Sequence, residues 1–190
     1  EVNQNGNVYI ATDLGLFYYD ASVDEILKIT TNEGLVHNVL NDVFLAEDTT
    51  LWFAPNGASL FSFKNSEYTV HKNIDNLTQY VLRTIIQLKS GAICFGTETD
   101  GVFLLDRDSV FQLSTLNGLL SNSVYSLTQK DNGIIWAFHK RGITKFNESL
   151  EVIDYLERDE LYDAELGENS IYHDVTGVIW VGTNKGIIRF

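Results

Sequence analysis

The chain of 190 residues contains one cysteine, one proline and no methionine, and basic residues are also scarce. A single cysteine, Cys94, permits no disulfide within the chain. Cysteine usage therefore does not indicate whether the protein resides in an oxidising or a reducing compartment. The chain has 13 lysines and arginines and 26 aspartates and glutamates, which gives a net charge of −13. This charge repels phosphate backbones, and no cluster of basic residues offsets it. We therefore expect no nucleic-acid partner.

Long apolar runs are absent as well. No stretch approaches the roughly 18 apolar residues that a membrane helix needs, and the first residues, EVNQNGN, lack the basic and apolar regions of a signal peptide. We expect this segment itself to make no membrane contact. The motifs GxGxxG, GxSxG, HExxH, CxxC and the P-loop are also missing. These absences predict that the chain carries no catalytic residues and no cofactor.

Candidate metal ligands are present, but their spacing is unsuitable. The histidines show no metal-ligand spacing, which favours surface or hydrogen-bonded structural roles for His37, His71, His139 and His173. The largest acidic cluster matches no calcium loop, so a solvated loop is favoured over a cation site for Glu157, Asp159, Glu160 and Asp163. We expect no metal site.

The sequence does contain an internal repeat. Leucines lie 42 residues apart at Leu35, Leu77, Leu119 and Leu161. A second column, with spacings of 42 to 44, contains Tyr9, Trp52, Cys94, Trp136 and Trp180. A period near 42 falls within the roughly 40 to 45 residues of a four-stranded propeller blade. In this column Cys94 is expected to replace a buried ring as a small apolar side chain, in preference to acting as a reactive thiol.

The fourth copy shows how one repeat divides into strands. Residues 124–129 alternate between two faces, as in a short strand. The turn KDNG, the apolar run IIWAFH, the turn KRG and the segments ITKFN and LEVIDYL follow. A glycine recurs after the aromatic column, at Gly15, Gly57, Gly101, Gly142 and Gly186, and a turn that needs a positive φ explains it. Four strands in about 40 residues, with no helical periodicity, predict an all-β fold.

The predicted architecture is a β-propeller of four-stranded antiparallel blades, because no single sheet with two apolar faces can bury both alone. We expect a single propeller segment, residues 1–190, with roughly four and a half blades. The predicted blades are 1–31 (partial), 32–73, 74–115, 116–157 and 158–190 (partial). The first copy begins on a second strand and the last stops on a third strand.

Three segments carry a resemblance to a known family. The run GLLSNSVYSLTQKDNGIIWAFHKRGITKFN, the tail GVIWVGTNKGIIRF and the opening GNVYIATDLGLFYYD resemble two-component regulator propeller repeats. The resemblance covers essentially the whole chain. Departures include WFAPNG in place of Trp-x-Gly-Thr in the second copy, Cys94 for tryptophan, and Tyr80 for asparagine in the third.

The resemblance implies a function. Such repeats are typical of the extracytoplasmic, periplasmic region of bacterial hybrid two-component sensor histidine kinases, where they report oligosaccharides. The resemblance implies an oligosaccharide ligand. It also implies that the partners of this segment are further blades and downstream domains of a parent sensor, and that the parent could form a homodimer. The kinase would lie outside this chain. Because members usually carry seven blades, the chain is expected to be a fragment of a larger propeller.

Loops on a rigid scaffold are the usual location of recognition. The loops between second and third strands gather at one end of a propeller, and here they carry polar residues that contrast with the strands around them. The predicted ligand-binding residues are Asp13, Asn56, Glu98, Asp100, His139, Lys140, Arg141, Asn184 and Lys185. Within this set, the basic trio His139, Lys140 and Arg141 could bind a carboxylated or sulfated sugar through charge-assisted hydrogen bonds. The alternative is that all nine are solvated turn residues.

Two other function classes remain open at this point. One is a protein-interaction scaffold of the WD type, although the His and Trp-Asp signatures of that class are absent. The other is a propeller glycosidase or lyase. A glycosidase needs two carboxyl groups about 5 to 9.5 Å apart, and the only pair on one of these loops is Glu98 and Asp100.

Overall fold

The computed structural model describes residues 1–71, 80–107, 109–157, 161, 164–174 and 176–190. The described chain divides into two compact units, Glu1–Gln87 and Leu88–Phe190, and each is treated by itself. The predicted residues Leu77, Asp159, Glu160 and Asp163 lie outside the described part.

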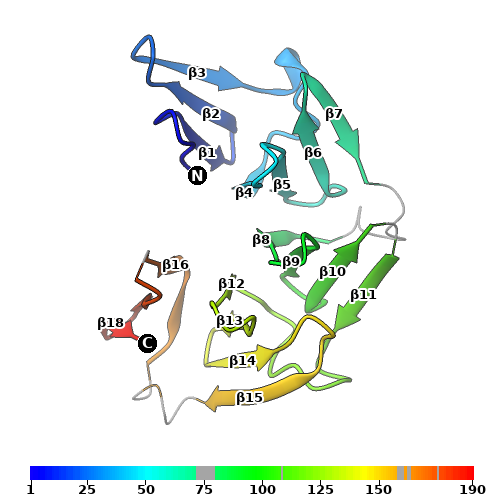
Figure 1. Cartoon of the computed structure of the whole chain (residues 1–190), viewed down its shortest axis with the longest axis vertical. Coiled ribbons are helices and arrows are strands. Elements are labelled where there is room, and N and C mark those ends of the chain that lie inside the picture. The colour runs from blue at the N-terminus through cyan, green and yellow to red at the C-terminus, as the bar shows by residue number, and fades with distance from the viewer. Residues whose placement is uncertain (72–79, 108, 158–160, 162–163, 175) are drawn as a thin grey trace. The chain divides into compact units, whose positions relative to one another are not determined.

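The first unit consists of antiparallel sheets that follow one another along the chain (Figure 1). Its first sheet has the order β1-β2-β3, and its second has the order β4-β5-β6-β7. A 3-10 helix, η1, separates them, and one further strand, β8, ends the unit. The elements are β1 (Val8–Thr12), β2 (Gly15–Asp20), β3 (Glu25–Ile29), η1 (Thr31–Glu33), β4 (Leu40–Leu45), β5 (Leu51–Pro55), β6 (Phe61–Lys64), β7 (Glu67–Val70) and β8 (Leu82–Gln87).

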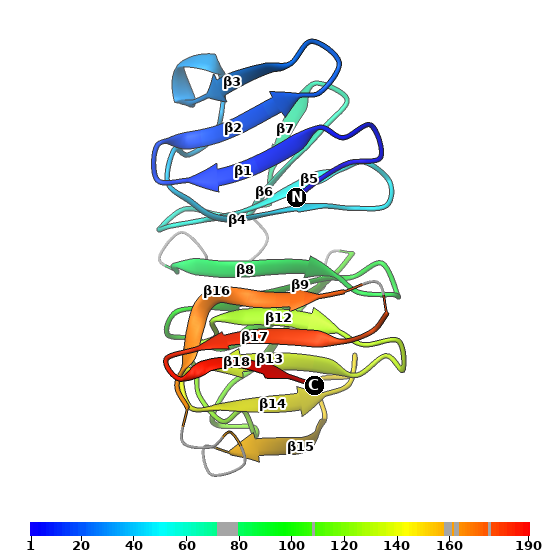
Figure 2. The same ribbon diagram turned by 90° about the vertical axis from the view of Figure 1, so that its left-hand side faces the viewer.

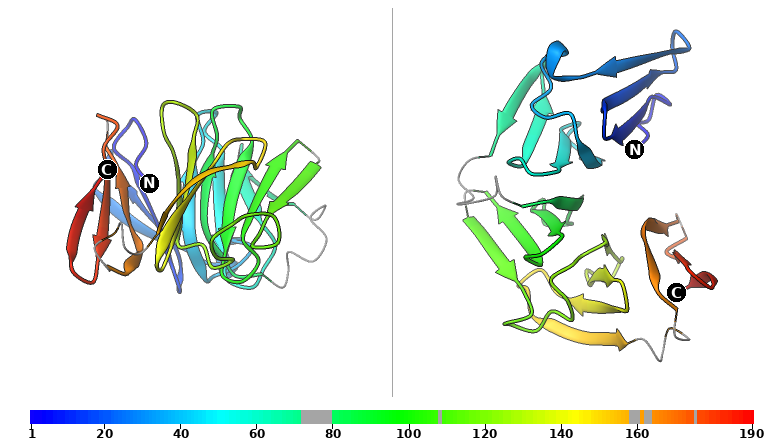
Figure 3. Two further views of the ribbon diagram at one scale, coloured as in Figure 1. Left: turned by 90° about the horizontal axis from the view of Figure 1, so that it is seen from below. Right: turned by 180° about the vertical axis from the view of Figure 1, so that it is seen from behind.

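The second unit continues the same plan. Neighbours in sequence pair with each other in the runs β9 to β11, β12 to β15 and β16 to β18. Figure 2 shows β14 and β15 running in opposite directions, and Figure 3 shows them side by side, with β10 beside β11. The strands are β9 (Ile93–Thr97), β10 (Val102–Asp106), β11 (Ser109–Leu113), β12 (Ser126–Gln129), β13 (Ile135–His139), β14 (Gly142–Phe146), β15 (Val152–Glu157), β16 (Leu166–His173), β17 (Ile179–Thr183) and β18 (Gly186–Arg189).

These elements confirm the all-β prediction, since the described residues contain no α-helix. The four strands expected in the fourth copy are β12 to β15. The first and last sheets have three strands each, as expected for copies that start on a second strand and stop on a third. In the last sheet, the β16–β17 register shifts between Leu166 and Ile171. The larger seven-bladed propeller, the fragment and the blade boundaries stay predictions.

The core consists of the apolar second strands and their neighbours. All five residues of β9 and of β13 are buried, as expected for strands that are covered on both faces. In the first unit, Phe53 and Phe61 stack with ring centroids 4.7 Å apart. The leucine column lies in the core at each described position, Leu35, Leu119 and Leu161. Cys94 is fully buried, and burial raises the pKa of its thiol, so its apolar role is confirmed.

The aromatic column is less uniform than its spacing indicated. Trp136 is only 8% exposed, whereas Trp180 is 39% exposed. Trp136 lies edge-on to Phe190, with the ring centroids 5.5 Å apart, and the ammonium groups of Lys130 and Lys145 lie 4.9 and 5.0 Å from its ring centroid. The same column position therefore gives a buried ring in one repeat and a partly exposed ring in another.

The glycine column has two physical causes. Four members adopt positive φ as predicted, for example Gly186 at 125°. Gly142 is not among the positive-φ glycines. A Cβ atom at Gly142 would lie 2.3 Å from Leu120 Cδ2 and 2.8 Å from the Leu156 carbonyl oxygen. At this position glycine is required by close packing, so the explanation from φ is wrong for one copy of the five.

A half-buried carboxylate links two repeats within the first unit. Asp42 of β4 accepts a hydrogen bond from the Ile85 backbone N–H of β8 at 3.0 Å. The neighbouring Asn41 donates its side-chain N–H to the Leu82 carbonyl at 2.7 Å. Burial raises the pKa of Asp42 to about 6, even though backbone hydrogen bonds from Ile85 and Val43 favour its charged form. Ionisation of Asp42 therefore costs folding free energy.

Candidate functional site

The predicted site residues lie in the turns after second strands, with one exception. In the first unit Asp13 lies in the β1–β2 turn and Asn56 directly follows β5. In the second unit the positions after β9, β13 and β17 hold Glu98, Asp100, Lys140, Arg141, Asn184 and Lys185. The exception is His139, which is the last residue of β13.

His139 is a structural residue and not an exposed loop cation. Its side chain is buried, and the residue is 1% exposed. Nδ1 lies 2.9 Å from the Ser123 carbonyl oxygen, and Nε2 lies 3.0 Å from Thr144 Oγ1. Burial lowers the pKa of His139 to about 4, so the ring is neutral at pH 7. The predicted basic trio therefore reduces to two cations, Lys140 and Arg141.

These two cations meet a carboxylate that the sequence reasoning missed. The Glu165 carboxylate lies 3.4 Å from Lys140 Nζ and 3.2 Å from an Arg141 guanidinium nitrogen. Arg141 Nε also donates to Glu165 at 3.3 Å. Burial opposes ionisation of Glu165, but the hydrogen bonds and charges of Lys140 and Arg141 outweigh it and lower its pKa. Because two cations share one carboxylate, Lys140, Arg141 and Glu165 together keep a net charge of one positive unit.

Backbone hydrogen bonds fix the position of Glu165. The Leu166 N–H donates to the Lys140 carbonyl at 2.9 Å, which ties the start of β16 to the β13–β14 turn. The Glu165 N–H donates to Asn184 Oδ1 at 2.9 Å, and the Asn184 N–H donates to the Glu165 carbonyl at 3.0 Å. The structure thus brings together three of the predicted residues, Lys140, Arg141 and Asn184, around Glu165. We call these four residues the Glu165 cluster.

A sequence signal for Glu165 exists. Counting back from it in steps of 42 residues reaches Ser123, Val81 and Val39, none of which is charged. A carboxylate at a repeat position that otherwise holds apolar or small residues marks a local departure. Its contact with Lys140 and Arg141, 25 and 24 residues earlier, depends on how the two repeats pack.

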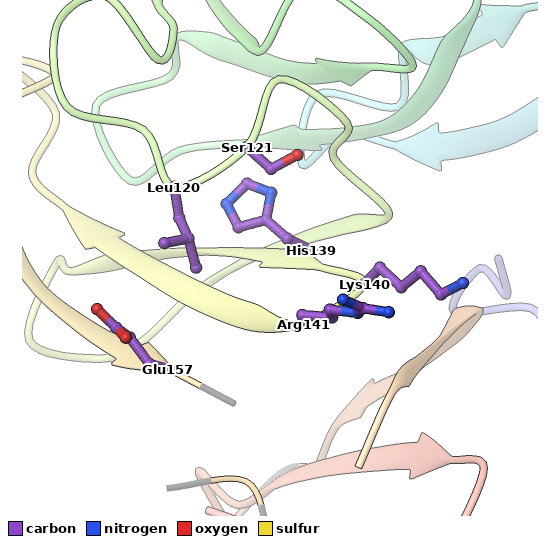
Figure 4. Close-up of a pocket in the computed structure, with 6 residues that line it drawn as sticks. All are labelled: Leu120, Ser121, His139, Lys140, Arg141 and Glu157. Carbon is purple, nitrogen blue, oxygen red and sulfur yellow. The ribbon is translucent and has the colours of Figure 1, made fainter. Parts of the chain in front are cut away.

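A cavity of about 360 Å³ opens beside the cluster (Figure 4). Lys140 and Arg141 lie on one side of it and Glu157 on the other, while the His139 ring points toward Ser121. The remaining wall residue is Leu120, which is 36% exposed. The volume falls within the roughly 300 to 1,000 Å³ of small-molecule sites. The cavity combines an apolar wall, a hydroxyl and groups of both charges.

Hydrogen bonds hold two of the other predicted residues, Asp100 and Asn56. The Asp100 N–H donates to Thr97 Oγ1 at 2.9 Å, and the Asp100 carboxylate accepts a hydrogen bond from Thr99. The Asn56 N–H donates to the Val39 carbonyl at 3.0 Å. Asp13 and Asn56 belong to the first unit. Within the described residues no group of three or more His, Cys, Asp or Glu side chains is arranged to hold a metal ion.

Solved structures with the same architecture identify the fold as a β-propeller. The chain is similar to the extracellular domain of a protein described as a hybrid two-component system from B. thetaiotaomicron, with 22% identity and a TM-score of 0.80. A second such domain from B. thetaiotaomicron gives 18% identity and a TM-score of 0.74. The alignments cover 100% and 99% of this chain and 26% of each of those chains.

A third similar structure is a streptogramin B lyase, with 15% identity and a TM-score of 0.68 over 100% of this chain and 62% of that one. No protein-family model matches the chain, and no curated protein matches it in sequence. The chain spans about a quarter of the length of the two extracellular domains. The resemblance to the propeller repeats of two-component regulators is confirmed at the level of the fold. No helix in the described residues is long and apolar enough to cross a membrane.

Proposed function

We propose that this chain is a ligand-sensing propeller segment of an extracytoplasmic, periplasmic hybrid two-component sensor, and that it binds without catalysis. The observation that carries the proposal is the match of the whole chain to two extracellular domains of such systems. The kinase and the downstream domains would lie elsewhere in the parent protein.

The ligand that fits the Glu165 cluster best is an acidic saccharide, carrying a carboxylate or a sulfate. Arg141 and Lys140 offer planar and point-charge donors for such a group. Ser121 and Glu157 can exchange hydrogen bonds with hydroxyl groups, and Leu120 can contact the C–H face of a sugar ring. Because the net charge of the chain is −13, this local positive charge is the feature that selects an anion.

The Glu165 contacts suggest how binding would be reported. Their lengths of 3.2 to 3.4 Å exceed the roughly 2.7 to 2.9 Å of strong charge-assisted hydrogen bonds. An incoming anionic group can therefore replace the Glu165 carboxylate at moderate cost. Release of Glu165 would loosen its side-chain link to the β13–β14 turn, while the Leu166–Lys140 backbone hydrogen bond persists. We propose this exchange as the conformational step of sensing.

A propeller lyase or glycosidase is the second candidate, and the structural match to a streptogramin B lyase favours it. It requires carboxylates that act on a bound substrate, and Glu98 and Asp100 are the pair that the sequence offers. A protein-interaction scaffold of the WD type is the third candidate.

The test is calorimetric titration of the chain with uronic-acid and sulfated oligosaccharides, with product analysis of each mixture. We expect binding without turnover. Arg141→Ala should weaken binding at least about tenfold, since a charge-assisted hydrogen bond contributes roughly 1.5 to 3 kcal/mol. Lys89→Ala is the matched control, because it removes an exposed cation of the second unit that lies outside the cavity. Unchanged affinity in Arg141→Ala refutes the site, and turnover that Glu98→Gln abolishes refutes the sensor assignment.

A further inference from the structure

A second cavity in the second unit lies away from the Glu165 cluster. It has a volume of about 480 Å³, and it opens between the β10–β11 hairpin and the β14–β15 turn. Among its lining residues are Leu104, Asp106, Phe111, Asn117, Glu148 and Leu150. We call it the Phe111 pocket.

The apolar part of the Phe111 pocket comes from one face of the hairpin. Leu104 and Phe111 are direct cross-strand partners, so their side chains lie on the same face of the sheet. Leu104 is 6% exposed, whereas Phe111 is 52% exposed. A half-exposed ring above a buried leucine offers a flat apolar surface to a ligand. On the other side, Leu150 contributes from a tight turn and adopts φ of 61°.

The polar groups of the pocket are oriented by other residues. Asn117 Oδ1 accepts a hydrogen bond from the Ser114 N–H at 2.6 Å, and Asn117 Nδ2 donates to the Gln112 carbonyl at 3.0 Å. The Glu148 carboxylate accepts a hydrogen bond from Gln129 Nε2 at 2.6 Å. Groups that are held in this way lose little conformational entropy when a ligand binds.

Asp106 differs from these two residues. It follows Leu104 by two positions along β10, so both side chains project to the same face of the sheet. Among the residues that the structure describes, none donates a hydrogen bond to the Asp106 carboxylate or forms an ion pair with it. Its acceptor capacity is therefore available to a ligand.

We propose that the Phe111 pocket binds an uncharged pyranose unit. Such a ring has an apolar C–H face that fits against an aromatic ring and a rim of hydroxyl groups that donate hydrogen bonds to carboxylates. The lining residues that the structure describes include two carboxylates and no lysine or arginine, so the pocket repels acidic sugars. The Phe111 pocket and the Glu165 cluster would then accept opposite classes of saccharide unit.

The test is a titration of the isotope-labelled chain with methyl β-galactopyranoside and methyl β-glucopyranoside, followed by amide chemical shifts. We expect at least one of the two to give saturable shifts in β10, β11 and the β14–β15 turn, and the sodium salt of galacturonic acid to give none there. Phe111→Ala should weaken binding about fivefold or more, and Phe111→Tyr should change it by less than about twofold. Ile153→Ala is the matched control, since Ile153 is 53% exposed and lies outside the pocket.

If Phe111→Ala disturbs the fold, Asp106→Ala provides the second variant, and it should weaken binding while its other amide shifts stay native. Absence of shifts with both glycosides overturns the proposal. Unchanged affinity in Phe111→Ala also overturns it. In a parallel titration with glucosamine, shifts with glucosamine but with neither glycoside would indicate a site for ammonium ligands and overturn it as well. Arg141→Ala should leave uncharged sugar binding unaltered, and Phe111→Ala should leave acidic saccharide binding unaltered. The two sites can therefore fail independently.

Discussion

Replacement of the column tryptophans tests how the repeats pack. A tryptophan ring buries roughly 150 to 250 Å², which at about 25 cal/mol per Å² corresponds to about 4 to 6 kcal/mol. Trp136 is 8% exposed and has two ammonium groups over its ring. We expect Trp136→Ala to lower the free energy of unfolding by about 3 to 5 kcal/mol, because partial collapse of the cavity recovers some of the loss.

The matched control is Trp180→Ala at the same repeat position. Trp180 is 39% exposed, and its Nε1 donates to Asp174 at 2.8 Å, at the surface. Scaling the Trp136 loss by the buried fractions of the two rings gives an expected loss of about 2 to 3 kcal/mol. Trp136→Phe should lose less than Trp136→Ala, because it keeps an aromatic ring in the core.

Urea unfolding followed by far-ultraviolet circular dichroism measures all three variants without relying on tryptophan fluorescence. The slope of unfolding free energy against urea should stay constant across the series. Equal losses in Trp136→Ala and Trp180→Ala would refute the reasoning, because burial at the two positions differs while the chemistry of the substitution does not.

Three further predictions concern acidity, packing and the cluster. Asp42 has a pKa raised to about 6 in the folded chain and about 3.9 when unfolded, so stability is lost as the pH rises from about 4 through 6. Urea unfolding at pH 4 and pH 7 measures the difference in unfolding free energy between Asp42→Asn and the parent chain. This difference should shift in favour of Asp42→Asn by about 2 to 3 kcal/mol from pH 4 to pH 7. A difference that does not change with pH would contradict this. Gly142→Ala should lower the unfolding free energy by about 2 to 3 kcal/mol, because the new Cβ atom would meet Leu120 and a backbone oxygen. Gly133→Ala, where a Cβ atom would have open space, should lower it by about 1 kcal/mol from φ strain alone. The reverse order would disprove the packing explanation. Glu165→Gln should raise calorimetric affinity for acidic saccharides about threefold or more by freeing two cations, and weaker binding would argue against the exchange.

Much of the fold follows from the repeat itself. The period of about 42 residues and the two-residue alternation predicted the strand pattern, because those features express local geometry that each copy repeats. The buried Cys94 was predictable in the same way, since the column defines the environment of its members.

The predictions fail where a residue keeps the type of its column but has a different environment. Trp180 matches the column in sequence, but its exposure depends on what lies against the last sheet. Gly142 has the residue type of its column for a different reason, because Leu120 approaches it from another segment.

The candidate site was predictable as a set of turns but not as a set of interactions. His139 was assigned to a loop because it precedes Lys140 and Arg141, although it ends an apolar run whose strand is buried on both faces. That run was the available signal for its burial. Glu165 is 24 residues from Arg141, and only the packing of neighbouring repeats brings the two side chains together.

A crystal structure of the chain with its tightest-binding acidic oligosaccharide tests the central claim most directly. We predict that a carboxylate or sulfate group lies within about 3 Å of the Arg141 guanidinium and the Lys140 ammonium, with the Glu165 side chain displaced. A ligand bound elsewhere, with the three Glu165 contacts intact, would contradict the assignment of this cluster as the sensing site.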